Sequence, residues 1–227
     1  MRPVTHWNAE WWPSEPTSDR IYVSNNAGTT ITVLASTDGA TLGTIEVGGA
    51  PEAAVADLKG HVYVNIEDKN EIVAIDAATM AVTAHWALRG KKPTGLAMDV
   101  KHRRLFSGCR DTKTMEVLDA DSGKTVASLP IGAGVDGSIF DPATGNAFSS
   151  NGGDGTLTIV HEDTPDTFRV LQSLPTRIGA KTMAFDGTTR RILLVAAERV
   201  IESAADPAAP RRVTYKPGTF AILVVGQ

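Results

Sequence analysis

The sequence predicts an all-β fold, a β-propeller of about five four-stranded blades. Aromatic residues recur at corresponding points with gaps of 41, 43 and 42 residues, at Tyr22, Tyr63, Phe106 and Phe148. Aspartates that close a short apolar string recur with gaps of 42, 42 and 45 residues, at Asp57, Asp99, Asp141 and Asp186. Helical periodicity is absent from the repeating unit. A fixed period of this size indicates one supersecondary unit copied along the chain, and a blade has this length.

Residues 94–131 illustrate the predicted unit. Four short apolar or alternating runs, at 94–99, 105–109, 115–118 and 124–129, are separated by polar turns. Runs of this length joined by tight turns rich in Gly and Asp are typical of an antiparallel meander. One meander cannot bury both of its faces, so we expect the copies to stack against one another.

The copies predict one propeller domain over residues 1–227, with repeats at about 7–47, 52–88, 94–131, 136–175 and 180–226. The last repeat has strand-like runs at 181–186, 191–196 and 219–225, and an insertion of about 21 residues precedes the third run. The insertion includes residues 206–210 and is expected to be an irregular loop. A fourth strand is missing from this repeat, so residues 1–5 would have to supply it in a closed ring.

The composition excludes several classes of protein. Hydrophobic residues make up 42% of the chain and charged residues 21%, as in ordinary globular proteins. The net charge of −4 makes nucleic acid an unlikely partner, and the single cysteine, Cys109, excludes an intrachain disulfide. No apolar run approaches the ~20 residues that span a bilayer. The N-terminal residues lack the apolar region of a signal peptide, which predicts a cytoplasmic protein if the chain is complete.

Several strings are shared with a known repeat family. They are Arg-Ile-Tyr-Val-Ser-Asn at 20–25, Val-Tyr-Val-Asn at 62–65, Val-Leu-Asp-Ala-Asp-Ser-Gly-Lys at 117–124, Phe-Asp-Pro-Ala-Thr-Gly at 140–145, and Pro-Gly-Thr-Phe-Ala-Ile-Leu-Val-Val-Gly at 217–226. With these strings the chain resembles the YVTN/YncE-type β-propeller repeat family, whereas the Trp-Asp pair of WD40 repeats is absent. The resemblance implies a propeller, usually seven-bladed, and a periplasmic or extracellular location. The count of about five blades and the missing export signal depart from that pattern. They favour an open arc of a larger propeller over a closed five-bladed ring.

Propeller geometry predicts which residues gather at the mouth of the central channel. The innermost strand of each blade starts on one face, so equivalent positions near these starts form a ring. Counting five residues back from each repeated aspartate selects Glu52, Thr94, Asp136 and Lys181. Positions four beyond the aromatic residues, Asn26, Glu67 and Arg110, are expected on the same face. We predict a polar ligand site at this mouth, with solvated loop residues as the alternative.

The other polar motifs are interpreted as structural. The repeated aspartates are expected to be turn residues whose carboxylates accept bonds from backbone N–H groups. The string at 119–123 resembles the start of a calcium loop, but a strand follows at once, which favours a hairpin turn. The histidines at 6, 61, 85, 102 and 161 show no metal-site spacing, so we expect no metal or cofactor. Residues 161–163 are predicted to form an exposed outer turn.

The sequence therefore predicts a non-enzymatic binding propeller that presents the channel mouth to a small ligand or a protein partner. A Gly-x-Ser-x-Gly nucleophile elbow is absent, and Cys109 has no base placed beside it by any motif. One alternative is a lactonase-like hydrolase with a metal between acidic groups such as Glu52 and Asp136. A second is nucleic-acid binding through the basic turns at 101–104 and 190–191, although neighbouring aspartates are expected to offset that charge.

Overall fold

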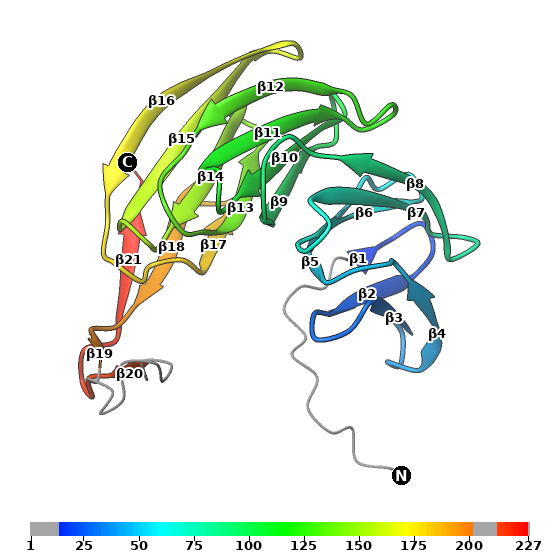
Figure 1. Cartoon of the computed structure of the whole chain (residues 1–227), viewed down its shortest axis with the longest axis horizontal. Coiled ribbons are helices and arrows are strands. Elements are labelled where there is room, and N and C mark those ends of the chain that lie inside the picture. Colours follow the sequence, from blue (N-terminus) through cyan, green and yellow to red (C-terminus); the bar gives the residue numbers. More distant parts are fainter. Residues whose placement is uncertain (1–13, 202–212, 227) are drawn as a thin grey trace.

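The structure, a computed structural model, describes residues 14–201 and 213–226. Every regular element in this part of the chain is a β-strand, so the all-β prediction is confirmed. Among these residues, no helix has the length and apolar character needed to pass through a membrane. The strands form successive sheets that follow one another around an open arc, with the first and last sheets at its two ends (Figure 1).

The first three sheets, which we call blades 1 to 3, are four-stranded antiparallel meanders in chain order. Each strand of blade 3 begins and ends within one residue of the bounds predicted for it. Blade 1 contains β1 (Ser14–Glu15), β2 (Arg20–Asn25), β3 (Thr30–Ala35) and β4 (Thr41–Glu46). Blade 2 contains β5 (Pro51–Ala56), β6 (His61–Ile66), β7 (Glu71–Asp76) and β8 (Ala81–Ala87). Blade 3 contains β9 (Pro93–Asp99), β10 (Arg104–Cys109), β11 (Thr114–Asp119) and β12 (Thr125–Pro130).

Blade 4 is again a four-stranded meander, and blade 5 has three strands. The insertion of blade 5 begins with β19 (Arg199–Ile201) and ends with β20 (Val213–Tyr215), and these two strands pair as a short hairpin. The irregular-loop prediction is therefore wrong for these residues. Valine and isoleucine favour strand pairing there, and residues 206–210 lie outside the described part. Blade 4 contains β13 (Val135–Asp141), β14 (Asn146–Asn151), β15 (Thr156–Thr164) and β16 (Thr167–Pro175). Blade 5 contains β17 (Met183–Asp186), β18 (Arg191–Ala196) and β21 (Ala221–Val225).

The prediction of an exposed outer turn at 161–163 is wrong. These residues belong to β15, which continues to Thr164, and His161 and Glu162 pair with Arg169 and Phe168 of β16. The hairpin of blade 4 is longer than its equivalents and turns only at residues 165–166. Glu162 is buried rather than solvated, as are Ala77 and Ala120 at the equivalent positions of blades 2 and 3.

The apolar core lies between blades, and the repeated aromatic residues are at its centre. Tyr22, Tyr63 and Phe106 are fully or almost fully buried in three successive clusters. Phe106 stacks on Phe140 of blade 4 with ring centroids 5.2 Å apart. Burying each such side chain contributes roughly 1.5–3 kcal/mol. The repeat of the sequence is therefore a repeat of the packing between neighbouring blades.

The inner strands of blades 3 and 4 approach closely, which fixes the geometry of the channel mouth. Gly95 of β9 faces Ser138 of β13, and a Cβ on Gly95 would lie 2.6 Å from the Ser138 hydroxyl oxygen and 2.7 Å from its backbone nitrogen. Only glycine fits this approach. Thr94 and Asp136, at the starts of the same two strands, are thereby held on neighbouring blades.

Blade 5 differs from the others in having one exposed apolar face. In β18 and β21, Leu193 lies opposite Val224, and Val195 lies opposite Ile222. Ile222 and Val224 are each 57% exposed. Alternate residues of the same strands pack toward blade 4. One face of this sheet is therefore buried against its neighbour, and the other faces solvent.

Candidate binding site at the channel mouth

The predicted ring positions lie near the starts of the inner strands. Glu52, Thr94 and Asp136 are the second residues of β5, β9 and β13, and Lys181 lies two residues before β17. These strands line the inner side of the arc (Figure 1). The repeat register thus places four corresponding residues at the same end of four successive inner strands.

Four of the six predicted site residues join one network of ion pairs. The Asp136 carboxylate oxygen Oδ1 lies 3.0 Å from Nη2 of Arg110 and 3.0 Å from Nζ of Lys181. The other guanidinium nitrogen, Nη1, is 3.8 Å from Oε1 of Glu67, which is 3.7 Å from Nζ of Lys92. Glu67 and Lys92 follow strands of blade 2, Arg110 follows β10 of blade 3, and Lys181 precedes blade 5. The network therefore joins blades 2, 3, 4 and 5.

The other two predicted residues lie outside this network. Asn26 of blade 1 donates a hydrogen bond of 2.8 Å to Oε1 of Glu52, and Glu52 is buried. Thr94 is also buried, and its hydroxyl donates a 3.2 Å hydrogen bond to the Lys92 carbonyl. Thr94 therefore supports the turn that carries Lys92 and does not present its hydroxyl to a ligand.

The charged ends of the network are unequally exposed. The side chains of Asp136 and Glu67 are 16% and 19% exposed, whereas those of Arg110 and Lys181 are 31% and 49% exposed. The two carboxylates are thus less exposed than the two cations, which present more of their side chains to solvent. Partly exposed ion pairs contribute only about 0–1 kcal/mol each to stability. The network therefore does more to orient the two cations than to stabilise the fold.

The opposite face carries the turns between the first and second strands, where the repeated aspartates lie. Oδ1 of Asp57 accepts bonds from the backbone N–H groups of Lys59, at 2.8 Å, and His61, at 2.9 Å. Burial raises the pKa of Asp57, but these two bonds and the Arg103 guanidinium outweigh that effect and hold the pKa below its usual range. The prediction that these aspartates are turn residues is confirmed, since Oδ1 of Asp99, Asp141 and Asp186 likewise accepts backbone N–H bonds.

Arginines of the basic turns on this face pair with acidic neighbours, as predicted. Arg104 donates to Asp119 at 2.7 Å and to Asp166 at 3.0 Å. Arg190 donates to Asp141 at 2.9 Å. A phosphate backbone would have to displace these carboxylates, so the pairs weaken the case for nucleic-acid binding through this face.

Cys109 is buried at the end of β10. Burial, followed by the negative charge of Glu116, raises the pKa of the thiol to about 12. A thiol that stays protonated at neutral pH is a poor nucleophile. The residue packs in the core between blades 2 and 3.

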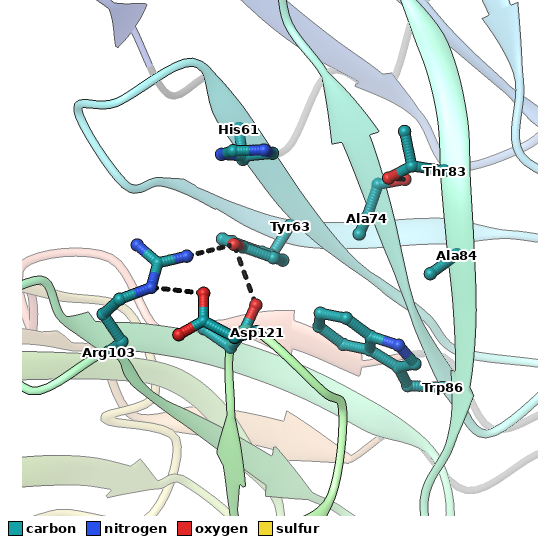
Figure 2. A pocket seen from close by; sticks show the side chains of 9 residues that line it. His61, Tyr63, Ala74, Thr83, Ala84, Trp86, Arg103 and Asp121 are labelled. Carbon is teal, nitrogen blue, oxygen red and sulfur yellow. Dashed lines mark hydrogen bonds and ion pairs between the residues drawn. The ribbon is translucent and has the colours of Figure 1, made fainter.

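A pocket of about 280 Å³ between blades 2 and 3 was not predicted from the sequence (Figure 2). The Tyr63 ring stacks on Trp86 with centroids 5.7 Å apart, and Arg103 donates to the Tyr63 hydroxyl at 3.0 Å and to Asp121 at 2.6 Å. Burial raises the pKa of Tyr63 to about 12. A Cβ on Gly123 would overlap the Trp86 indole, but the φ of 69° at Gly123 already favours glycine, so the sequence alone does not indicate the pocket. The lining residues are His61, Tyr63, Ala74, Thr83, Ala84, Trp86, Arg103, Ala120 and Asp121.

No protein-family model matches the chain, and no curated protein sequence matches it. Among solved structures, a chain of hydrazine synthase from Kuenenia stuttgartiensis, which contains a β-propeller, is similar over 99% of this chain and 69% of its own length. The TM-score is 0.70 and the sequence identity is 12%, so the likeness shows the fold alone. The predicted β-propeller fold of about five blades is confirmed. Membership of the YVTN/YncE-type family stays a prediction.

Proposed function

We propose that the chain is a binding propeller whose channel mouth holds the anionic group of a small ligand. The observation that carries this proposal is that two cations from different blades, Arg110 and Lys181, share one carboxylate oxygen of Asp136. Asp136 holds both cations in place while their charged ends remain more exposed than its own. A guanidinium and an ammonium held side by side suit a carboxylate or phosphate group.

The blade framework gives this site its pre-organisation. Arg110 is further fixed by a 3.0 Å hydrogen bond from Nε to the Val135 carbonyl, which belongs to the same strand as Asp136. A cation that is already ordered loses little conformational entropy when a ligand binds. Arg110 therefore supplies orientation, and the more exposed Lys181 supplies a charge that can move onto the ligand.

The proposal is tested by calorimetric titration with inorganic phosphate and succinate as probes. We expect binding by the wild-type protein, and at least about tenfold weaker binding by an Arg110→Gln/Lys181→Ala double variant, a loss of about 1.4 kcal/mol or more. Lys101→Ala, which removes an exposed lysine from the opposite face, is the matched control and should bind as the wild type does. No binding of either anion at about 10 mM, or equal affinity in the double variant, would refute the proposal.

The alternative of a hydrolytic metal between Glu52 and Asp136 is less well supported. The Oδ1 atom of Asp136 would have to exchange two cations for the metal, and Glu52 already accepts a hydrogen bond from Asn26. If Asp136→Asn abolished bound metal but left anion binding unchanged, this alternative would replace the proposed function. A protein partner at the mouth would instead be disrupted by Lys181→Glu, which reverses the exposed charge.

A further inference from the structure

The turn before the second strand of every blade ends in a residue with an unusual backbone conformation. The residue that precedes each second strand has a positive φ, between 52° and 97°. In blades 3 to 5 this position follows the repeated aspartate by four residues, whereas in blade 2 it follows by three. Side-chain differences among blades 3 to 5 therefore reflect the neighbourhood and not the length of the turn. The residues are Asp19, Gly60, Arg103, Gly145 and Arg190 in blades 1 to 5.

At two blade interfaces an arginine at this position neutralises the aspartate of the preceding blade. Arg103 of blade 3 donates from Nη1 to Oδ2 of Asp57 in blade 2 at 3.0 Å. Arg190 of blade 5 donates from Nη2 to Oδ2 of Asp141 in blade 4 at 2.9 Å. Asp57 and Asp141 are both buried, so a cation beside each one compensates its charge.

The interface between blades 3 and 4 lacks this arginine. The corresponding residue of blade 4 is Gly145, so Asp99 of blade 3 receives no guanidinium from this position. Instead Glu162, which is 8% exposed, occupies a position that is a buried alanine in blades 2 and 3. The same backbone bond marks the equivalent positions: Ala77, Ala120 and Glu162 donate their N–H groups to the carbonyls of Gly60, Arg103 and Gly145.

A third difference from the other blades places an imidazole beside these carboxylates. In blades 4 and 5 a threonine, Thr144 or Thr189, follows the repeated aspartate by three residues and donates its hydroxyl to that aspartate. The equivalent residue of blade 3 is His102. Its Nδ1 atom lies 2.7 Å from Oδ2 of Asp99 and 2.7 Å from Oε1 of Glu162. Ligand atoms of the three residues all lie within 4.8 Å of one another.

The charges of this cluster are not balanced by the groups that contact it. Asp99 and Glu162 are two buried carboxylates that share one imidazole nitrogen. The second oxygen of Glu162, Oε2, is buried and has no hydrogen-bond partner among the described residues. Burial, and then the charge of Asp99, raise the pKa of Glu162. The cluster has donor atoms for a cation at the place where two other interfaces hold a guanidinium.

We propose that Asp99, His102 and Glu162 form a binding site for a divalent transition metal ion of the Zn²⁺ class, which joins blade 3 to blade 4. One imidazole and two carboxylates are a donor set that Zn²⁺ accepts, and water completes such a site. The His102 side chain is 34% exposed, so the ion has access from solvent. The present separations are hydrogen-bond distances, and the side chains need to part by less than about 1 Å to admit the ion. This inference does not depend on the proposed function of the channel mouth.

The first test is a titration of chelator-treated full-length protein with Zn²⁺. We expect about one ion to bind per chain and the Tm to rise by roughly 5 °C or more when Zn²⁺ is about 100-fold above its Kd. His102→Ala and Glu162→Gln should each weaken binding at least about tenfold. His61→Ala is the matched control, because His61 lies beside an aspartate that Arg103 already neutralises, and it should leave the Kd unchanged.

The second test restores the missing arginine without removing a metal ligand. Gly145→Arg places a guanidinium where blades 3 and 5 have one, at a φ of 69° that resembles the 56° of Arg103. We expect this variant to fold and to lose the Zn²⁺-dependent rise in Tm, whereas Gly145→Ala, which adds no charge, keeps it. Circular dichroism and a cooperative melt report whether each variant folds. If Gly145→Arg does not fold, loss of the Zn²⁺-dependent rise in Tm is measured in Glu162→Gln instead.

Two outcomes would overturn the proposal. If the wild-type protein binds no Zn²⁺, and Glu162→Gln raises the Tm without metal, the cluster shares a proton and does not hold a metal. If Zn²⁺ binds but the Kd is the same in His102→Ala and Glu162→Gln, the ion lies elsewhere on the chain.

Discussion

Blade 3 and blade 5 are built from the same repeat, but they are buried very differently. Both faces of β10 and β11 are buried, because blade 3 lies between two neighbours. In β18 and β21 burial alternates along the strand, because only blade 4 packs against blade 5. The local sequence therefore determines the meander, whereas the neighbours determine how much of it is core.

The ion pairs between blades also differ in how far they are buried. The side chain of Arg103 is 20% exposed and contacts an Asp57 side chain that is fully buried. Arg190 occupies the equivalent position in blade 5 and is 46% exposed. One turn position thus holds a largely buried guanidinium in the middle of the arc and a half-exposed one at its end.

The largest expected effect is the loss of an aromatic residue from the middle of the arc. Phe106→Ala removes a fully buried ring that contacts Phe140 and Phe168, and should lower the free energy of unfolding by about 3–5 kcal/mol. Val224→Ala, on the exposed face of blade 5, should cost less than about 0.5 kcal/mol. Urea denaturation measures both, and similar losses in the two variants would contradict the comparison.

A smaller effect is expected from the interblade arginines. Arg103→Ala leaves the buried carboxylate of Asp57 without its guanidinium, and should cost about 2–3 kcal/mol. Arg190→Ala removes an equivalent guanidinium that is 46% exposed, and because its partner Asp141 is only 6% exposed the change should still cost about 1–2 kcal/mol. The same urea assay in high salt should reduce the second loss more than the first, since solvated pairs are screened. A larger loss for Arg190→Ala would show that exposure does not set the strength of these pairs.

The pH dependence of stability sharpens the comparison further. The pKa of Asp57 is lowered in the folded protein, so its contribution is fully present above the unfolded pKa of about 3.9 and is lost as the pH falls through the folded value. In a His61→Ala background, which removes the imidazole 3.0 Å from the Asp57 carboxylate, the difference in unfolding free energy between Asp57 and Asp57→Asn should be constant from about pH 7 to 5. It should then shrink toward about pH 2. Urea denaturation across this range checks it, and a difference that does not shrink below about pH 4 would contradict the prediction.

The smallest expected effect concerns the exposed face of blade 5. Ile222→Thr and Val224→Thr replace side chains that are each 57% exposed, and each should change the unfolding free energy by less than about 0.5 kcal/mol. Exposed apolar residues promote association, so light scattering should show less aggregation in the double variant. A large loss of stability would mean that this face is covered in solution.

The repeat made most of the fold predictable, since period, turn residues and alternation all favour a four-stranded unit. The positions of Arg110, Asp136 and Lys181 followed from the same register, because equivalent residues of successive blades share one end of the inner strands. The prediction of an exposed turn at Glu162 was wrong because the hairpin of blade 4 is longer than its equivalents, and a glutamate occupies a position that is a buried alanine in blades 2 and 3. Its contact with His102 joins residues 60 positions apart in the sequence, and one sequence alone gives no signal for such a contact.

The separate sheets have a consequence for how the chain opens. Each blade completes its own ladder of backbone hydrogen bonds, and blades meet mainly through side chains. A blade at the end of the arc can therefore detach without breaking the ladders of its neighbours. Amide hydrogens in β21 should exchange through such local openings, while those of β10 exchange only when neighbouring blades have separated. The arc is thus expected to lose its structure progressively, from blade 5 toward the middle.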